Sequence, residues 1–238
     1  MKVEGGAPQP PRIAALLGLT PLFDGLRRDE LDRLAEHSSL HDVGRGSVIY
    51  RAGELCQGLH LLVSGQVKLC LASASGHEKV VEIVDPGQTF GTAVVFTGAP
   101  YVASAHALRD SSLLLIPRRS VLDELDRGAE FCQRMLGVLS RRVQRFIGDI
   151  EAYTLHTGRT RVVDYLLGCD DARCGVPRPH GARSLQLAHS KGTVASRLNL
   201  TQEHFSRILH QLSEAGLIRV DKRTIHIPDV QRLRAAAD

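Results

Sequence analysis

The stretch that decides the fold is Lys191-Gly-Thr-Val-Ala-Ser-Arg-Leu-Asn-Leu-Thr-Gln-Glu-His-Phe-Ser-Arg-Ile-Leu-His-Gln-Leu212. Its apolar residues recur at spacings of three and four, which predicts two amphipathic helices. The apolar positions are Val194, Ala195 and Leu198 in the first helix and Phe205, Ile208, Leu209 and Leu212 in the second. Asn199 and Leu200 separate the two groups, and Thr201 is a residue type that caps helix N-termini. We therefore expect two helices joined by a tight turn.

The second predicted helix carries polar residues on the face opposite its apolar stripe. Glu203, Ser206 and Arg207 stand at i, i+3 and i+4, so their side chains project together. Arginine can bond both acceptors of guanine, glutamate can accept from cytosine, and serine can do either. This is the layout of a helix-turn-helix, whose second helix reads the major groove. An ordinary helical hairpin with a solvated polar face is the alternative for this stretch alone.

The residues that follow favour the DNA-binding interpretation. Gly216–Val220 and Thr224–Pro228 flank a polar tip at 221–223, which is typical of a β-hairpin. A helix-turn-helix followed by a hairpin is a winged helix. Lys191 and Arg197 are expected to touch only phosphate. The full set of expected DNA contacts is Lys191, Arg197, Thr201, Gln202, Glu203, His204, Ser206 and Arg207.

Composition sets the bounds on the protein class. The chain has 238 residues and 43% hydrophobic residues, enough for two domains with real cores. The net charge of +4 is uneven, with −2 over residues 1–140 and +6 over residues 141–238, so a polyanion partner is expected at the C-terminal part. No apolar run approaches the ~20 residues that cross a bilayer, no signal peptide is recognisable, and the five cysteines are irregularly spaced. We expect a cytoplasmic protein that has no membrane partner.

The N-terminal part has the pattern of a β-sheet domain. Residues 1–11 are expected to be disordered, and 21–35 to form a turn and an amphipathic helix. Short apolar runs bounded by turn residues then predict strands at 48–50, 59–63, 67–71, 80–84 and 112–116. Many short strands separated by glycine turns indicate an antiparallel sandwich or barrel.

A long helix is predicted from Glu130 to Leu155. An apolar seam with the 3.5-residue repeat of paired helices predicts a homodimer through this helix, while a helix packed on its own domain is the alternative. The seam residues are Leu136, Leu139, Val143, Phe146, Ile150 and Tyr153. A further helix is expected at 160–167, followed by a loop at 169–182. Cys169, Cys174 and His180 in that loop make an incomplete ligand set, so no metal site is expected.

These parts, in this order, resemble the Crp/Fnr superfamily of bacterial transcription regulators. The resemblance rests on 61–69 (LLVSGQVKL), 86–91 (PGQTFG), the seam helix and the Glu203-x-x-Ser-Arg207 pattern. It implies an α+β protein with a cyclic-nucleotide-binding-type β-roll at 1–128, a dimerisation helix at 129–156 and a winged helix at 157–238. It also implies a homodimer that binds palindromic promoter DNA and works with RNA polymerase. Segment 195–207 is most similar to the Dnr (dissimilative nitrate respiration regulator) branch, which implies TTGA-type half-sites.

The resemblance also indicates which ligands or cofactors the β-roll could use to sense a signal. Cyclic-nucleotide binders of the family have a Glu directly after Phe-Gly and an Arg about ten residues on, where this chain has Thr92 and Val102. A buried cyclic phosphate without a cation is costly, so cyclic AMP is not expected. An iron–sulfur cluster is not expected either, because the first cysteine is Cys56. The Dnr-like option is a haem that senses nitric oxide, with His60 or His106 as the candidate ligand.

Two other functions stay open at this point. The chain could respond to a different small molecule, or it could be a regulatory or scaffold protein whose winged helix contacts proteins. No nucleophile elbow, phosphate-binding loop, HExxH or dinucleotide fingerprint occurs in the sequence. We therefore do not expect an enzyme.

Overall fold

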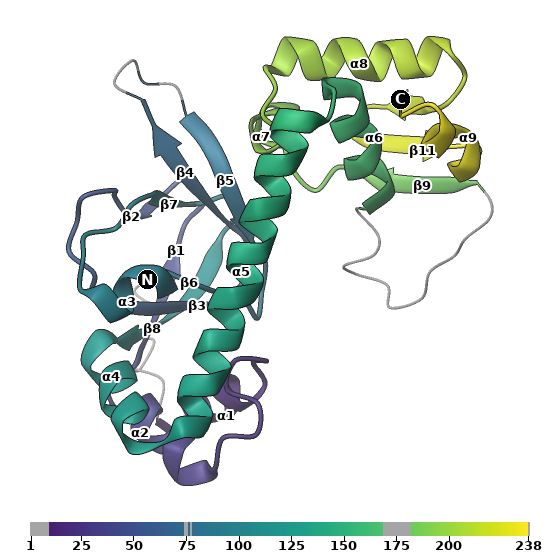
Figure 1. Cartoon of the computed structure of the whole chain (residues 1–238). Coiled ribbons are helices and arrows are strands. Elements are labelled where there is room, and N and C mark those ends of the chain that lie inside the picture. The colour runs from purple at the N-terminus through teal and green to yellow at the C-terminus, as the bar shows by residue number, and fades with distance from the viewer. Residues whose placement is uncertain (1–9, 74–75, 77, 169–181, 238) are drawn as a thin grey trace, which may run out of the picture. The chain divides into compact units, whose positions relative to one another are not determined.

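The structure, a computed structural model, describes residues 10–73, 76, 78–168 and 182–237 (Figure 1). The chain divides into two compact units, Met1–Gln144 and Arg145–Asp238, each with its own hydrophobic core. The division falls inside one long helix, α5 (Ala129–Leu155), so both units include part of it. The bounds implied by the resemblance, with residues 129–156 as a separate dimerisation helix, stay a prediction. Among the described residues, no helix is both long and apolar enough to cross a bilayer.

The first unit contains two four-stranded antiparallel sheets. One sheet has the order β1 (Ser39–Val43), β8 (Ser111–Pro117), β3 (Gly58–Ser64) and β6 (Thr89–Phe90). The other has the order β2 (Val48–Tyr50), β7 (Ser104–Ala107), β4 (Val67–Ala72) and β5 (Glu78–Val84). All five strands predicted from the sequence are present. The short strands β1, β6 and β7 were not predicted, because polar or small residues interrupt their apolar pattern.

Strand β3 is buried on both faces, which explains its nearly continuous apolar sequence. Leu62 belongs to the core that also includes Phe90 and Ala105. Leu59 and Leu61 belong to a second core, formed with the helices of this unit. Those helices are α1 (Pro10–Gly18), α2 (Arg28–Glu36), α4 (Arg118–Arg127) and the start of α5, and the short α3 (Thr92–Thr97) follows β6.

Helix α1 corrects the expectation of disorder at residues 10 and 11, because the helix begins at Pro10, whereas residues 1–9 lie outside the described residues. Proline is tolerated in the first turn of a helix, where its missing N–H has no intrahelical partner. Ile13 and Leu17 of α1 are buried in the second core, so packing fixes this segment.

The second unit is a winged helix, as predicted. Its helices are α6 (Gly158–Gly168), α7 (Lys191–Arg197), α8 (Gln202–Glu214) and α9 (Val230–Ala235). Its sheet has the order β10 (Arg219–Asp221), β11 (Thr224–Ile227) and β9 (Arg183–Gln186). The predicted hairpin is β10–β11, and β9 adds a third strand that the sequence did not indicate. Asn199 turns the chain between α7 and α8 with φ of 57°, a conformation that asparagine tolerates better than most residues.

Some residues discussed from the sequence lie outside the described part of the chain. They are Cys169, Cys174 and His180 of the predicted loop. The ligand set that they could contribute is therefore neither supported nor contradicted.

Candidate DNA-reading surface and sensor interior

Helix α8 is held at its start and along its back. The Thr201 side chain accepts a hydrogen bond from the His204 backbone N–H at 3.2 Å, which is the predicted N-cap. Phe205, Ile208 and Leu209 are buried in the core of the second unit. This packing fixes the direction in which the opposite side of the first two turns points. A helix that contacts base edges needs such a fixed orientation.

The predicted base-reading residues share this open side. Gln202, Glu203 and Arg207 are exposed, and Ser206 is half-buried. Thr201 is also exposed at the start of the helix. The structure thus brings together the residues that the i, i+3, i+4 spacing placed on one face.

Two expected contacts lie close to neighbouring helices of the same unit. A Cβ on Gly158 would lie only 3.3 Å from the His204 ring, so His204 packs against the start of α6. A Cβ on Gly192 would lie 2.7 Å from Gln202 Oε1, so the end of the Gln202 side chain lies against the start of α7. His204 is therefore a packing residue, whereas Gln202 bridges both helices of the helix-turn-helix.

Arg197 is not the free phosphate contact that the sequence suggested. Its Nη2 donates to Asp149 Oδ1 at 2.9 Å, and its Nη1 donates to Tyr153 Oη at 2.7 Å. The Tyr153 hydroxyl in turn donates to the Arg197 carbonyl at 2.6 Å. Although burial opposes the charge, the hydrogen bond with Asp149 raises the pKa of Arg197 above its ordinary value. Arg197 therefore ties α7 to the end of α5.

Lys191, the other expected phosphate contact, has a different setting. It is the first residue of α7, which Ser190 caps by accepting a hydrogen bond from Thr193 N at 3.1 Å. Within the described part of the chain, Lys191 forms no ion pair and is half-buried. Its cation, unlike that of Arg197, remains available.

The predicted seam of α5 is largely uncovered. Leu136, Val143, Phe146 and Ile150 are 57%, 55%, 41% and 61% exposed, and Leu139 is half-buried. Tyr153 is an exception, because it bonds Arg197 as described. Such a row of exposed apolar side chains on one helix is typical of an interface.

A second stripe on α5 faces the sheet domain. Phe131 and Met135 are 1% exposed and Val138 packs against the same core, so this stripe has spacings of four and three. Arg142 continues it after four more residues. The interpretation of a helix packed on its own domain therefore holds for this stripe, whereas the homodimer through the exposed seam stays a prediction.

Arg142 is the functional candidate that the sequence reading missed. Its guanidinium donates to Glu82 Oε2 at 2.6 Å and 3.0 Å, and to the Thr89 carbonyl at 3.4 Å. It also donates to Thr92 Oγ1 at 3.4 Å. The side chains of Arg142 and Glu82 are only 10% and 7% exposed. The sequence contained one indication of this role, because an arginine stands where the apolar stripe of Phe131, Met135 and Val138 would continue.

Arg142 thus contacts the residue at the position where the family's nucleotide binders carry a glutamate. Thr92 is fully buried, and Val102, which stands at the position of the family's arginine, is 73% exposed. Gly91 has φ of 76°, and a Cβ there would approach Tyr101 to 3.3 Å. Arg142 is the cation that contacts Thr92, and its ion pair with Glu82 already neutralises it.

The two histidines proposed as haem ligands point in different directions. His60 lies inside the first unit, 6% exposed, with its Nδ1 buried and without a hydrogen-bond partner. His106 alternates with Ala105 and Ala107, which are buried, so it faces away from that core. Of the two candidate ligands, His106 therefore does not point into the core around Ala105.

The surroundings of His60 do not fit a haem. Its ring centroid lies 5.0 Å from that of Phe90, 5.3 Å from that of Tyr50 and 6.2 Å from that of Tyr101. A macrocycle bound at His60 would have to displace these rings. We derive no role for haem from this arrangement.

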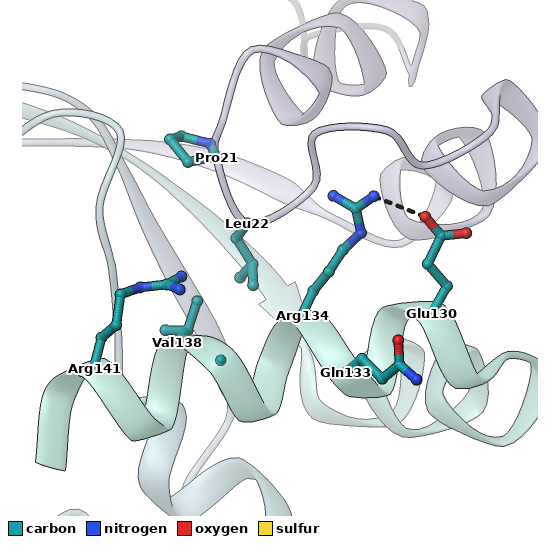
Figure 2. Close-up of a pocket in the computed structure, with 8 residues that line it drawn as sticks. Pro21, Leu22, Glu130, Gln133, Arg134, Val138 and Arg141 are labelled. Atoms are coloured by element: carbon teal, nitrogen blue, oxygen red, sulfur yellow. Dashed lines mark hydrogen bonds and ion pairs between the residues drawn. The ribbon is translucent and has the colours of Figure 1, made fainter.

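A separate pocket of about 360 Å³ lies in the first unit beside α5 (Figure 2). Leu22 and Val138 form part of its apolar lining, and Arg134 and Arg141 contribute charge. Figure 2 shows Arg134 turned toward Glu130, to which its Nη2 donates at 2.8 Å. One of the two cations is therefore already paired.

Comparisons with known proteins agree with this architecture. Residues 40–127 match the family model of the cyclic nucleotide-binding domain, and residues 160–236 match that of the Crp-like helix-turn-helix domain. The chain is 28% identical to the cyclic AMP receptor protein of Thermus thermophilus over 218 residues, covering 92% of this chain and 97% of that protein.

Solved structures give the same result. The sensor domain of the transcriptional regulator DNR from Pseudomonas aeruginosa is 30% identical, with a TM-score of 0.53, covering 62% of this chain and 98% of that chain. FixK2 from Bradyrhizobium japonicum is 21% identical and shows the fold, with a TM-score of 0.71 over 83% of this chain and 96% of that chain. With both domains matched in the same order, the chain belongs to the Crp/Fnr family of transcription regulators.

Proposed function

We propose that the protein is a homodimeric regulator that binds palindromic promoter DNA with TTGA-type half-sites. The observation that carries this proposal is the exposed placement of Glu203 and Arg207 on α8, whose back is buried by Phe205, Ile208 and Leu209. The Glu-x-x-Ser-Arg pattern supports the Dnr-type half-site. RNA polymerase is the partner that such a regulator would recruit.

Each residue has a distinct part in the proposed readout. Arg207 bonds the O6 and N7 of the guanine, and Glu203 accepts from N4 of the cytosine in the complementary strand. Ser206 contributes to selection of the outer thymine. Two α8 helices of a dimer would enter successive major grooves about 34 Å apart, one turn of the double helix.

The test is a binding series on every single-base variant of the half-site. Arg207→Ala should weaken binding to the preferred sequence by roughly 1–3 kcal/mol and remove the preference at the guanine. Arg119→Ala is the matched control, because Arg119 is an exposed arginine on α4 and its loss changes the net charge equally. Equal weakening on all variants, with the guanine preference intact, would mean that Arg207 contacts only the backbone.

The scaffold alternative makes a different prediction for the same assay. A winged helix that contacts proteins would show no affinity that falls steeply with salt, since that dependence comes from phosphate contacts. A salt titration with the preferred site therefore separates a DNA-binding regulator from a protein-binding scaffold.

The signal in this proposal is a stimulus other than cyclic AMP. Support comes from the exposed Val102, the buried Thr92 and the pairing of Arg142 with Glu82. Nitric oxide sensing through haem stays a prediction that rests on the family resemblance. An absorption spectrum of the protein purified from its own host tests it directly.

A further inference from the structure

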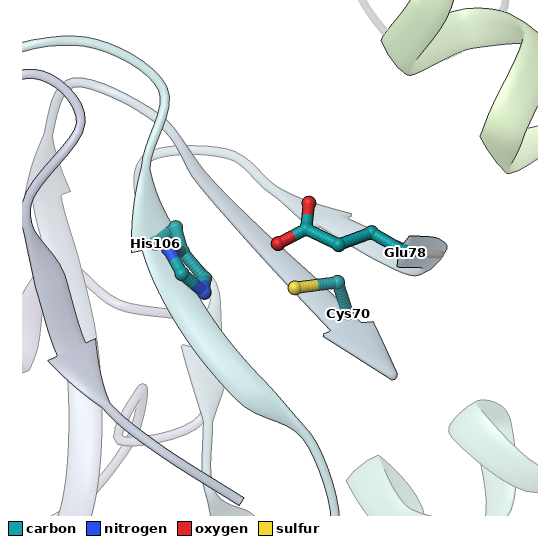
Figure 3. Close-up of side chains that lie close together, drawn as sticks. All are labelled: Cys70, Glu78 and His106. Atoms are coloured by element: carbon teal, nitrogen blue, oxygen red, sulfur yellow. The ribbon is translucent and has the colours of Figure 1, made fainter. Parts of the chain in front are cut away.

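Three potential metal ligands meet on the second sheet of the sensor unit. Cys70 lies on β4, Glu78 on β5 and His106 on β7. Their ligand atoms, the Cys70 sulfur, a carboxylate oxygen and a ring nitrogen, all lie within 4.8 Å of one another. Figure 3 shows the Cys70 sulfur, the Glu78 carboxylate and the His106 ring turned toward one another.

Strand register explains why these residues share a face. On one side of β4, Lys68 pairs with His106 and Cys70 with Ser104, which puts His106 diagonally beside Cys70. On the other side, the register shifts between Leu69 and Cys70. Bulges of this kind redirect side chains within a sheet.

The shift changes which residues of β5 accompany Cys70. After the register shift, Cys70 pairs with Val80 and Ala72 pairs with Glu78. Residues that are directly paired across two strands lie on the same face of the sheet. Glu78 therefore joins Cys70 and His106 on the side away from the core that contains Ala105. Glu82, before the shift, faces Arg142 instead.

We propose that Cys70, Glu78 and His106 form a binding site for a transition metal ion of the Zn²⁺ class. A thiolate with an imidazole selects such ions over Mg²⁺ and Ca²⁺, which prefer oxygen ligands. Three protein ligands leave a fourth tetrahedral position for water or an external ligand. Because Zn–S and Zn–N bonds are about 2.3 Å and 2.0–2.1 Å, ligand atoms around a tetrahedral ion lie roughly 3.3–3.6 Å apart. Atoms that now lie within 4.8 Å of one another would therefore close by up to about 1.5 Å when the ion binds.

The pKa shifts of His106 and Glu78 favour the forms that bind a metal ion, whereas the shift of the Cys70 pKa opposes binding. Burial and the nearby Lys68 ammonium lower the pKa of His106, so its ring is neutral and can donate a lone pair. A hydrogen bond from Lys68 lowers the pKa of Glu78. Burial, and then Glu78, raise the pKa of the Cys70 thiol, so metal binding must release its proton.

Lys68 is the cation that a metal would replace. Its ammonium forms an ion pair with Glu78 and its side chain is 19% exposed. The Cys70 thiol meanwhile donates to the Ser104 carbonyl at 3.8 Å. Without metal, the Lys68 ammonium thus neutralises the Glu78 carboxylate. A divalent ion would take the place of that ammonium at the same carboxylate.

The experiment is an anaerobic Co²⁺ titration of the full chain in a Cys169→Ser/Cys174→Ser background, which removes the two cysteines of the C-terminal unit. The expected result is one equivalent of Co²⁺ with a near-ultraviolet thiolate-to-metal band, displaced by Zn²⁺ but not by Mg²⁺, with affinity rising as pH rises. This inference does not rest on the proposed function, because the titration requires no DNA.

Variants assign the ligands. Cys70→Ser should remove the thiolate band, and Cys132→Ser, which changes a half-buried thiol on α5, should keep it. His106→Gln and Glu78→Gln should weaken binding while keeping the circular dichroism spectrum. Lys68→Met should tighten binding, because it frees Glu78 from its resident cation.

Three results would overturn the proposal. The first is the absence of a one-equivalent thiolate band in the background protein. The second is a band that persists in folded Cys70→Ser, which would place the metal elsewhere. The third is affinity unchanged in both His106→Gln and Glu78→Gln, which would reduce the cluster to a hydrogen-bonded polar patch around Lys68.

Discussion

Arg142 of α5 donates two hydrogen bonds to one carboxylate oxygen of Glu82 in β5, at 2.6 Å and 3.0 Å. The pair is buried, and it joins the long helix to the sheet at the position of Thr92. In this chain an internal ion pair therefore occupies the region where the family's nucleotide binders place ligand-binding residues.

The first prediction concerns the stability of this pair. Arg142→Met alone should destabilise the sensor unit by about 3–5 kcal/mol, because it leaves the Glu82 carboxylate buried without a cation. The double variant Arg142→Met/Glu82→Gln should recover most of that loss. Urea unfolding of the four proteins of this cycle gives the comparison. Equal destabilisation in the single and double variants would mean that the pair is not coupled.

Cyclic AMP should not bind tightly. Arg142 is the cation that contacts Thr92, and Glu82 already holds it in an ion pair. Calorimetry should give no saturable heat, with the cyclic AMP receptor protein of Thermus thermophilus as the positive control. Micromolar binding with a matching gain in DNA affinity would contradict this prediction.

The exposed seam of α5 should hold two copies together. Leu139→Asp/Phe146→Asp should yield monomers in sedimentation, because burial of each such apolar side chain contributes roughly 1.5–3 kcal/mol. Gln144→Asp is the control, since Gln144 is exposed on another side of the same helix. A double variant that stays dimeric would show that the seam is not the interface.

Lys191 and Arg197 should differ when each is replaced by alanine. Lys191→Ala should reduce the salt dependence of DNA binding by about one unit of slope, as expected for one lost phosphate contact. Arg197→Ala should leave that slope unchanged and lower the unfolding free energy by about 1–3 kcal/mol, because Asp149 and Tyr153 lose their partner. A fall in slope for Arg197→Ala would restore its role as a phosphate contact.

The sensor unit should lose stability as pH falls because of His60. Burial, with a smaller effect from His41, lowers the pKa of His60 from 6.5 to about 4. The unfolded chain then takes up a proton that the folded chain does not, so the unfolding free energy decreases below pH 6.5 by up to about 3 kcal/mol.

Two variants isolate this effect. His60→Phe should flatten the dependence of the unfolding free energy on pH between about 6.5 and 4. Tyr50→Phe changes a ring of the same aromatic cluster and should keep the dependence. An unchanged slope in His60→Phe would assign the pH dependence to other groups.

Local sequence determined the winged helix, the long helix and five strands, because helical and strand periodicity, N-caps and turn residues act over a few residues. Thr201, Asn199 and the apolar back of α8 are all readable in this way. The face that carries Glu203 and Arg207 follows directly from helical geometry.

The tertiary structure decided what depends on contacts between distant segments. Sixty residues separate Arg142 from Glu82, and 48 separate Arg197 from Asp149, so no local pattern shows that these charges pair. Likewise, the register shift in β4–β5 moves Glu78 beside Cys70, and alternation on β7 turns His106 outward. Pairing and register arise from packing of whole strands and helices, which a single sequence without its fold does not specify.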